Sequence, residues 1–185
     1  MKANVEKFPS GSVLVGFEPN DRFVYAFPGL PPTANKIWRS GSTSAQLPGL
    51  GPDPFLHAGR RKARTHRAPD YVKWINERLA DLFGIAPLDA PKYGFAVDLV
   101  VWPPNNRRFD IDNRIKPTLD MLTHAGVWED DSAVTVITAV RRPCVVKGGW
   151  TAVSVRPAAG IGETVSEIFW LPPEIWKRVI PKEEL

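Results

Sequence analysis

Two aspartates separated by one residue are the side chains whose type and spacing most favour chemistry on a phosphodiester. Asp110 and Asp112 stand at the end of a predicted strand. In extended backbone, alternate side chains point to the same face, so the two carboxylates converge. Close carboxylates repel each other, and a divalent cation between them removes that repulsion. Mg²⁺ prefers oxygen ligands and retains waters, which leaves positions for a phosphate oxygen and an attacking water. The pair therefore predicts a magnesium site for phosphodiester cleavage.

A lysine and a second pair of acids follow in the same region. Lys116 lies one helical turn after Asp112, where its ammonium group would neutralise negative charge that develops on the phosphate. Asp130 and Asp131 come after the predicted helix, where the chain turns back toward the next strand. We expect the strand-end pair and a post-helix acid to meet at one end of the sheet, which would give a three-carboxylate site.

Each of these residues also has a simpler structural interpretation. Asp112 or Asn113 would suit a helix N-cap, because both side chains accept hydrogen bonds from free backbone N–H groups. Lys116 would form an i,i+4 pair with Asp120, which stabilises a helix by only a few tenths of a kcal/mol. The acids at 129–131 would then be a solvated turn. The spacing alone leaves these alternatives open.

The elements that must position these residues follow from the apolar pattern and the turn residues. Strands are predicted at 23–28, 94–102, 133–140 and 150–156, and the last two flank a Lys-Gly-Gly turn typical of a hairpin. Helices are predicted at 69–83 and from 114 or 117 to 125, because a proline is tolerated in a first turn. The apolar stripes of these helices are Val72, Ile75, Leu79 and Leu82, and Ile115, Leu119 and Leu122. This order predicts an α+β fold, with two main helices packed on a single mixed β-sheet.

The chain divides into one domain with additions. The domain is expected at 23–156, preceded by an N-terminal extension at 1–22. Residues 40–59 are rich in Gly, Ser and Pro and lack apolar periodicity, so they are predicted to be an inserted flexible loop. Residues 157–185 are interpreted as a C-terminal appendage, with a short helix after the Pro-Pro pair at 172–173.

Composition and charge exclude several classes of protein. The 185 residues contain no stretch of about 18 apolar residues that would span a membrane, and the first residues lack the pattern of a signal peptide. Cys144 is the only cysteine, which excludes an intramolecular disulfide and a multi-cysteine zinc site, so a reducing interior is expected. No glycine-rich phosphate loop supports nucleotide hydrolysis. A net charge of +4 makes an anionic partner plausible.

Basic residues cluster at places where they would contact DNA phosphates. The segment 57–67 holds five Arg or Lys residues and no acid, although a solvated basic face is the alternative. Arg107 and Arg108 directly precede the first aspartate, beside which the scissile phosphate must lie. The predicted DNA-binding residues are Arg60, Arg61, Lys62, Arg64, Arg67, Arg107, Arg108, Asn35, Lys36 and Arg39. Contacts of this kind release counterions, so binding is expected to weaken steeply with salt.

The segment 107–134, RRFDIDNRIKPTLDMLTHAGVWEDDSAV, closely resembles the signature of the RusA family of Holliday junction resolvases. The matching residues are Asp110, Asp112, Asn113, Lys116, Asp120, Leu122, Thr123, Ala125, Gly126, Trp128, Asp130 and Asp131. Two weaker stretches, 27–39 (FPGLPPTANKIWR) and 145–150 (VVKGGW), agree with the family as well. Together the resemblance covers roughly 23–39 and 64–156.

The resemblance implies a homodimer that cuts four-way DNA junctions symmetrically with Mg²⁺. By position, the metal ligands would be Asp110, Asp112 and Asp131 rather than Asp130, and Lys116 would be the essential basic group. Asp110, Asp112, Lys116 and Asp131 are thus the predicted catalytic residues. A two-fold dimer fits a junction with two equivalent strands to cut. The implied location is the cytoplasm of a bacterial or phage-infected cell.

The additions to the family pattern leave the substrate open. The segments 1–22, 40–59 and 157–185 are extra, and such segments contact DNA arms or another protein in some enzymes. One alternative is a nuclease that prefers flaps or forks. Another is a non-catalytic architectural protein that binds junctions without cutting them.

Overall fold

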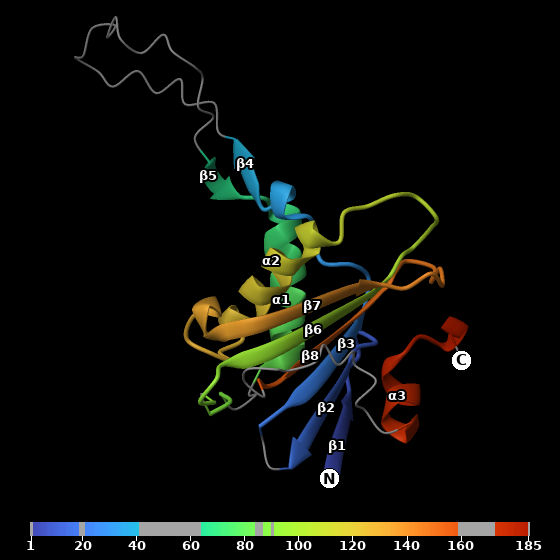
Figure 1. Ribbon diagram of the computed structural model, residues 1–185. Coiled ribbons are helices and arrows are strands. Elements are labelled where there is room, and N and C mark those ends of the chain that lie inside the picture. Colours follow the sequence, from blue (N-terminus) through green and yellow to red (C-terminus); the bar gives the residue numbers. More distant parts are fainter. Residues whose placement is uncertain are drawn as a thin grey trace, which may run out of the picture.

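The computed structural model describes residues 2–18, 21–40, 64–83, 87–89, 91–158 and 173–184 (Figure 1). Within these ranges, one six-stranded sheet has the order β1-β2-β3-β8-β6-β7 and a separate two-stranded sheet pairs β4 with β5. The strands are β1 Lys2–Lys7, β2 Val13–Glu18, β3 Phe23–Pro28, β4 Trp38–Ser40, β5 Arg64–Arg67, β6 Phe95–Trp102, β7 Val134–Arg141 and β8 Trp150–Pro157. The helices are α1 Pro69–Leu82, α2 Asp112–His124 and α3 Pro173–Val179, with short 3-10 turns η1 Ala34–Lys36, η2 Asp131–Ala133 and η4 Lys182–Glu184.

The main sheet is mixed, as the sequence predicts. β6 and β7 run parallel, and the other neighbouring pairs are antiparallel. Parallel neighbours need a long crossover connection, and α2 lies within the one that joins β6 to β7. The predicted α+β architecture, a single mixed sheet with helices packed on it, is therefore confirmed.

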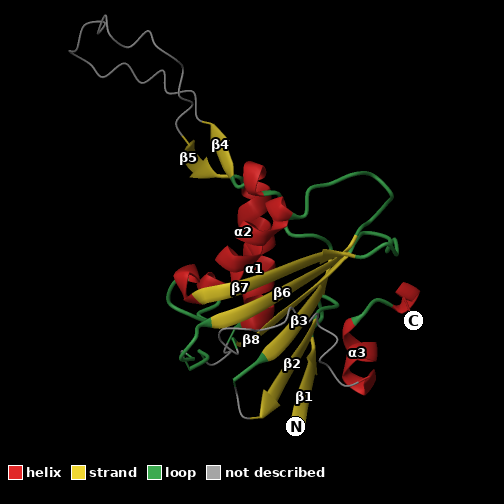
Figure 2. Cartoon of the chain, viewed as in Figure 1, coloured by secondary structure: helices red, strands yellow, loops and turns green. Residues whose placement is uncertain are grey.

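Alternation along the strands divides the core between the two faces of the sheet. Phe95 and Val97 of β6 face α1 and α2, whereas Val100 and Trp102 face α3. Figure 2 shows the two long helices on one side of the strands and α3 on the other. No helix in the described ranges has both the length and the apolar character to cross a bilayer. The face with α1 and α2 is the one that supports the predicted site.

The predicted hairpin between the last two strands is wrong. β8 pairs with β3 and β6, and β7 pairs only with β6, so β6 separates the two strands that were expected to be neighbours. The glycines at 148 and 149 do adopt positive φ, at 84° and 83°. They shape a tight turn in the loop that carries the chain across the end of β6. A favourable turn sequence thus sets the local backbone, while burial of β6 between two neighbouring strands sets the pairing.

Several elements differ from the sequence analysis at the N-terminal side of the domain. Residues 2–18, which were expected to be an extension, form β1 and β2 at one edge of the main sheet. β4 and β5 form a hairpin whose connecting residues, including all of the predicted 40–59 loop except Ser40, lie outside the described residues. On α1 the buried stripe contains Tyr71 in place of Val72, which is 38% exposed.

A buried polar cluster fixes α1 to the turn between β1 and β2. The Tyr25 hydroxyl donates to Asp81 Oδ2 at 2.7 Å, and Ser10 Oγ donates to the same oxygen at 2.8 Å. The Arg78 guanidinium donates to Ser12 Oγ at 3.0 Å. Burial raises the pKa of Tyr25, so this phenol stays protonated and able to donate. The cluster holds the helix that carries Tyr71 into the candidate site.

The second main helix begins earlier than predicted. α2 starts at Asp112, and Pro117 therefore lies in its second turn, not its first. The proline nitrogen has no hydrogen to donate to the Asn113 carbonyl, which would be its partner in an uninterrupted helix. Burial of Leu119 and Leu122 against the sheet stabilises the helix despite this lost bond. The first turn of α2 now carries Asp112 into the candidate site.

Candidate active site

The first pair of predicted acids lies at the entrance to α2. Asp110 is in the loop before the helix, Asp112 is its first residue, and both are exposed. The N-cap residue is Ile111, and no side chain accepts a capping hydrogen bond there. Asn113 Nδ2 instead lies 3.5 Å from Asp110 Oδ2. Neither Asp112 nor Asn113 is thus an N-cap, and the Asp112 carboxylate faces solvent beside the positive end of the helix dipole.

Lys116 joins the helix to the acid that follows it. Its Nζ lies 2.7 Å from Asp120 Oδ1 and 2.9 Å from Asp131 Oδ2. Hydrogen bonds to these two carboxylates raise the pKa of Lys116 above its ordinary value, so its ammonium group is charged at any physiological pH. The side chain remains 56% exposed, which leaves the ammonium accessible to a ligand. The i,i+4 pair considered as an alternative is present, and the contact with Asp131 adds a long-range partner to it.

The two adjacent acids after α2 have different partners. Asp130 Oδ1 accepts a hydrogen bond from the Ser132 backbone N–H at 2.9 Å and caps η2. That hydrogen bond also lowers the pKa of Asp130. Asp131 is half-buried and turns toward Lys116. The geometry therefore assigns Asp130 to the turn and directs Asp131 to the predicted site.

Asp110 and Asp131 belong to segments attached to opposite ends of the β6–β7 pair. Because these strands are parallel, Asp131 lies before the start of β7, near the start of β6, while Asp110 follows the end of β6. The expectation that the acids meet at one end of the sheet therefore stays a prediction. The crossover helix α2 covers the distance between them, and Lys116 makes the contact. The candidate site lies along α2 (Figure 1).

The acids match Mg²⁺ in their donor chemistry. Carboxylate oxygens are the hard ligands that this ion prefers, and it commonly binds one or two carboxylates and keeps several waters. In the described part of the chain, no three acidic, histidine or cysteine side chains lie close enough to form a metal-binding group. The ligand set Asp110, Asp112 and Asp131 thus stays a prediction, and two of its three carboxylates are exposed.

α1 contributes a tyrosine that the sequence analysis did not identify. The Tyr71 hydroxyl donates to Asp120 Oδ2 at 3.3 Å. Burial, reinforced by the charge of Asp120, raises the pKa of Tyr71 to about 12, so the phenol remains a hydrogen-bond donor. Asp120 is thereby held between Tyr71 and Lys116. The pairing depends on α1 and α2 packing side by side, which no local sequence pattern reveals.

The loop before α2 is anchored by an aromatic side chain between two guanidinium groups. Phe109 lies with its ring centroid 5.4 Å from the Arg114 guanidinium and 4.8 Å from that of Arg141. The Arg141 guanidinium also donates to the Arg107 carbonyl at 3.3 Å, and that of Arg114 donates to the Pro31 carbonyl. Cation–π contacts of this kind contribute about 0.5–1 kcal/mol each at exposed sites. They fix the backbone next to Asp110.

We expect Phe109→Leu to lower the rate of DNA cleavage by about 10- to 100-fold, because a small displacement of catalytic carboxylates is costly. Binding of DNA should change little. Tyr93→Leu is the matched control, since Tyr93 is an exposed aromatic paired with Lys92 at the other end of β6. Single-turnover cleavage by the two variants measures the effect. Equal rates for both would refute a positioning role for Phe109.

The predicted DNA-binding residues fall into three groups. Asn35 and Lys36 are exposed on η1, which packs against α2, and Arg107 and Arg108 are exposed in the loop before Asp110. Arg39 and Arg64 belong to the β4–β5 hairpin, where only their backbone is described. Arg60, Arg61 and Lys62 lie outside the described residues. The first group lies on two segments that adjoin α2, namely η1 and the loop before the helix.

Arg67 connects the hairpin to the C-terminal end of α2. Its guanidinium lies 3.0 Å from His124 Nε2 and 5.7 Å from the centroid of the Tyr71 ring. His124 Nδ1 lies 2.6 Å from the Asp120 carbonyl oxygen. Because an arginine only donates and a carbonyl only accepts, these contacts fit a neutral imidazole protonated at Nδ1. The stem of the basic segment is thus held on the same helix as Lys116.

Comparison with known proteins agrees with the motif on α2. A crossover junction endodeoxyribonuclease RusA from Aquifex aeolicus (strain VF5) is 28% identical over 94 residues, which is 51% of this chain and 74% of that protein. Relatives of the same name from Enterobacteria phage 82 and Escherichia coli (strain K12) are each 48% identical over 46 residues, which is 25% of this chain and 38% of theirs.

The endodeoxyribonuclease RusA family matches residues 57–156, more than half of the chain. This range contains α1, α2, β6, β7 and all of β8 except its last residue. The aspartates, Lys116, Tyr71 and Phe109 all lie within it. From the extent of this match and the place of the site inside it, we conclude that the chain belongs to the endodeoxyribonuclease RusA family.

Proposed function

We propose that this protein is a magnesium-dependent endodeoxyribonuclease that resolves four-way DNA junctions by paired, symmetric cuts. The observation that carries the proposal is the contact of Lys116 with both Asp120 and Asp131. Lys116 itself lies four residues after Asp112 in the chain. The contact brings the exposed Lys116 ammonium together with one acid of the same helix and one acid of the turn after it. Family membership and the crossover-junction names of the relatives support the nuclease activity and its branched substrate.

Each residue of the site has a distinct role in the proposed reaction. Asp110, Asp112 and Asp131 would hold Mg²⁺, which would polarise the scissile phosphate and supply hydroxide near neutral pH. The Lys116 ammonium neutralises charge on the phosphate as the bond to the leaving oxygen lengthens. Asp120 and Tyr71 keep that ammonium in place. Lys116 would exchange its contact with Asp131 for one with the phosphate.

The cations around the site are arranged to guide DNA to the acids. Arg107 and Arg108 lie in the loop directly before Asp110, and Asn35 and Lys36 lie on the 3-10 turn packed against α2. Arg67 contributes from the hairpin stem at the other end of α2. A DNA strand whose sugar-phosphate backbone runs along α2 would contact these basic side chains and present one phosphodiester to the acids.

A homodimer would supply the second active site that a symmetric junction requires. Two equivalent strands must be cut, and a two-fold axis presents two equivalent sites. The location in a bacterial or phage-infected cytoplasm belongs to the same proposal. Both inferences depend on the junction being the substrate.

Cleavage of a labelled synthetic four-way junction, with linear duplex alongside, in Mg²⁺ and in EDTA, tests the proposal. Symmetric nicks on the junction only, lost in EDTA, are the expected result. Faster cutting of flaps or forks in matched assays would replace the junction as substrate. Tight junction binding without any cleavage would contradict the nuclease proposal and favour an architectural role.

A further inference from the structure

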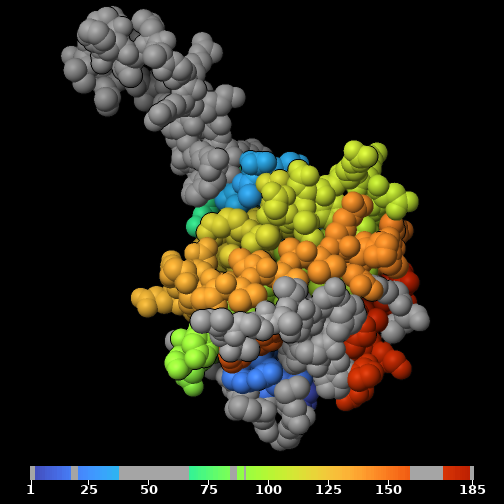
Figure 3. Space-filling view, viewed as in Figure 1, coloured from blue at the N-terminus to red at the C-terminus, as the bar shows by residue number. Residues whose placement is uncertain are grey.

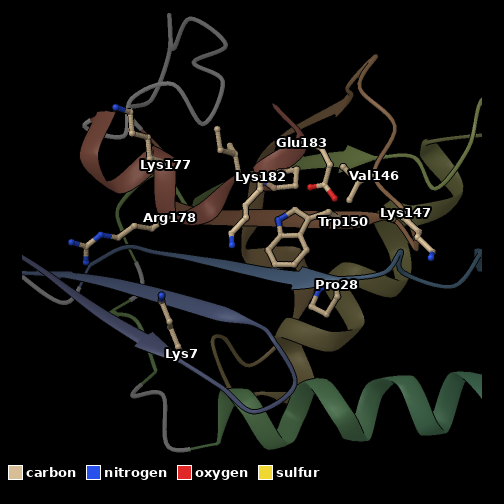
Figure 4. Close-up of a pocket in the computed structure, with 12 residues that line it drawn as sticks. Lys7, Pro28, Val146, Lys147, Trp150, Lys177, Arg178, Lys182 and Glu183 are labelled. Atoms are coloured by element: carbon tan, nitrogen blue, oxygen red, sulfur yellow. The ribbon is translucent and has the colours of Figure 1, made fainter. Parts of the chain in front are cut away.

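A second basic surface lies on the opposite face of the sheet from α1 and α2. It is a groove of about 500 Å³ between the C-terminal residues and the main sheet (Figure 4). Its charged lining residues are five cations and one acid, namely Lys7, Lys147, Lys177, Arg178, Lys182 and Glu183. The cations come from β1, the loop before β8, α3 and η4. In Figure 4, Lys7, Arg178 and Lys182 extend from three different elements on one side, and Lys147 lies beyond Trp150.

The floor and walls of this groove are fixed by the protein core. Ile175, Val179 and Ile180 are buried against the face of the sheet that contains Trp102. Trp150, which pairs with Pro28 at the start of β8, donates from its indole N–H to the Val179 carbonyl at 2.9 Å. α3 is thereby held on the sheet, and the groove keeps its shape without a ligand.

Among the described residues, the cations of the groove are not paired with acidic side chains. None of the five forms an ion pair with another residue whose placement the structure gives, and each is exposed. Like charges held near one another destabilise the fold unless counterions or an anionic ligand offset the repulsion. The surface is therefore arranged for a ligand with several negative charges.

A line of basic residues connects this groove to the loop of the candidate site. Arg141 donates to the Arg107 carbonyl, and the Val146 backbone N–H donates to the Pro103 carbonyl at 2.9 Å. The loop after β6, which carries Arg107 and Arg108, is thus bonded to the segment that carries Arg141 and Lys147. Figure 3 shows the loop after β6, the segment around β7 and the C-terminal residues adjoining along one side of the molecule.

We propose that the groove binds the phosphate backbone of a DNA arm that leaves the cleavage site. The inference rests on the proposed function, because it takes DNA as the ligand of the site on α2. An extended polyanion fits better than a single phosphate, since the cations are exposed and spread over four elements rather than gathered in a closed pocket. The arm would pass over the loop after β6, cross the end of the sheet beside Lys147 and reach Arg178 and Lys182.

The test compares the double variant Lys147→Gln/Lys182→Gln with the control Lys73→Gln/Lys92→Gln. Lys73 and Lys92 are exposed lysines outside the groove lining, so the control removes the same charge. Equilibrium binding to linear duplex and to junction is measured as a function of salt concentration. Each lost phosphate contact lowers the magnitude of the slope of log K against log salt concentration by about 0.9. The slope of the groove variant should therefore fall by nearly 2, and that of the control should change little. Slopes equal to those of the unmodified protein would overturn the proposal.

A second measurement separates this inference from the proposed function. Junctions with a series of arm lengths are bound and cut by both variants. The groove variant should bind long-armed junctions about tenfold more weakly and short-armed ones normally, because only long arms reach its two lost contacts. If the unmodified protein cuts no branched DNA, the proposed function fails, while the salt slope on duplex still decides the groove. If the defect is the same at every arm length, the path across the end of the sheet is wrong.

Discussion

Replacing Asp112 with Asn should lower the rate of junction cleavage by about 10³-fold or more, while the protein should still bind the junction. The carboxylate is exposed and makes no capping bond, so its loss leaves the fold of α2 intact. What disappears is one of the negative oxygen ligands that would hold Mg²⁺. Single-turnover cleavage at saturating protein, with binding measured in Ca²⁺ or EDTA, gives the two quantities separately.

The control for this variant is Glu129→Gln, an exposed acid in the turn before Asp131. It removes the same charge near the site without touching the proposed ligands, and should leave the cleavage rate within about twofold, since surface substitutions are usually mild. Cleavage retained by Asp112→Asn would remove this residue from the metal site. Loss of cleavage by both variants would point to net charge instead of ligation.

The Lys116→Gln variant should lose about 10²- to 10³-fold in maximal rate, comparable to the loss of a single charge-stabilising group in other enzymes. The effect of this substitution on the affinity for Mg²⁺ distinguishes a catalytic role of Lys116 from simple support of the fold. Without the ammonium, Asp120 and Asp131 are left without their shared cation. We therefore expect Mg²⁺ to bind more tightly even though the rate falls. Titration of cleavage with Mg²⁺ measures both the half-saturating concentration and the plateau.

The opposite changes in rate and metal affinity make this prediction specific. Lys73→Gln, at an exposed position of α1, should change neither quantity. A plateau that returns to the original rate at high Mg²⁺ would show that Lys116 acts only by organising the acids. Weaker Mg²⁺ binding would mean that the lysine holds Asp131 in its productive orientation.

Local patterns in the sequence predicted the parts of the fold that are determined by neighbouring residues. β6 is apolar except for Asp98 and is buried along its whole length, and α1 ends one residue before the predicted limit. The i,i+4 spacing of Lys116 and Asp120 indicated the ion pair that the structure contains. These features depend on periodicity and on residues that start or stop an element. They are readable without knowledge of the tertiary structure.

The features that the sequence did not predict depend on packing between distant segments. The Lys-Gly-Gly turn indicated a hairpin, yet β6 occupies the position between β7 and β8 because its apolar faces demand burial on both sides. Tyr71 reaches Asp120 only because α1 and α2 lie together. Phe109 is fixed by Arg114 and Arg141, of which the second is 32 residues away in the chain.

Pro117 weakens the attachment of the first turn of α2, which carries Asp112. The Asn113 carbonyl lacks its usual helical donor, so the turn that contains Asp112 is attached by one hydrogen bond fewer, a difference of about 1 kcal/mol in the cost of opening it. Pro117 lies directly after Lys116, while Leu119 and Leu122 beyond it are packed on the sheet. Opening this first turn therefore costs less than opening the same turn of an uninterrupted helix, and it leaves the packed half of α2 undisturbed.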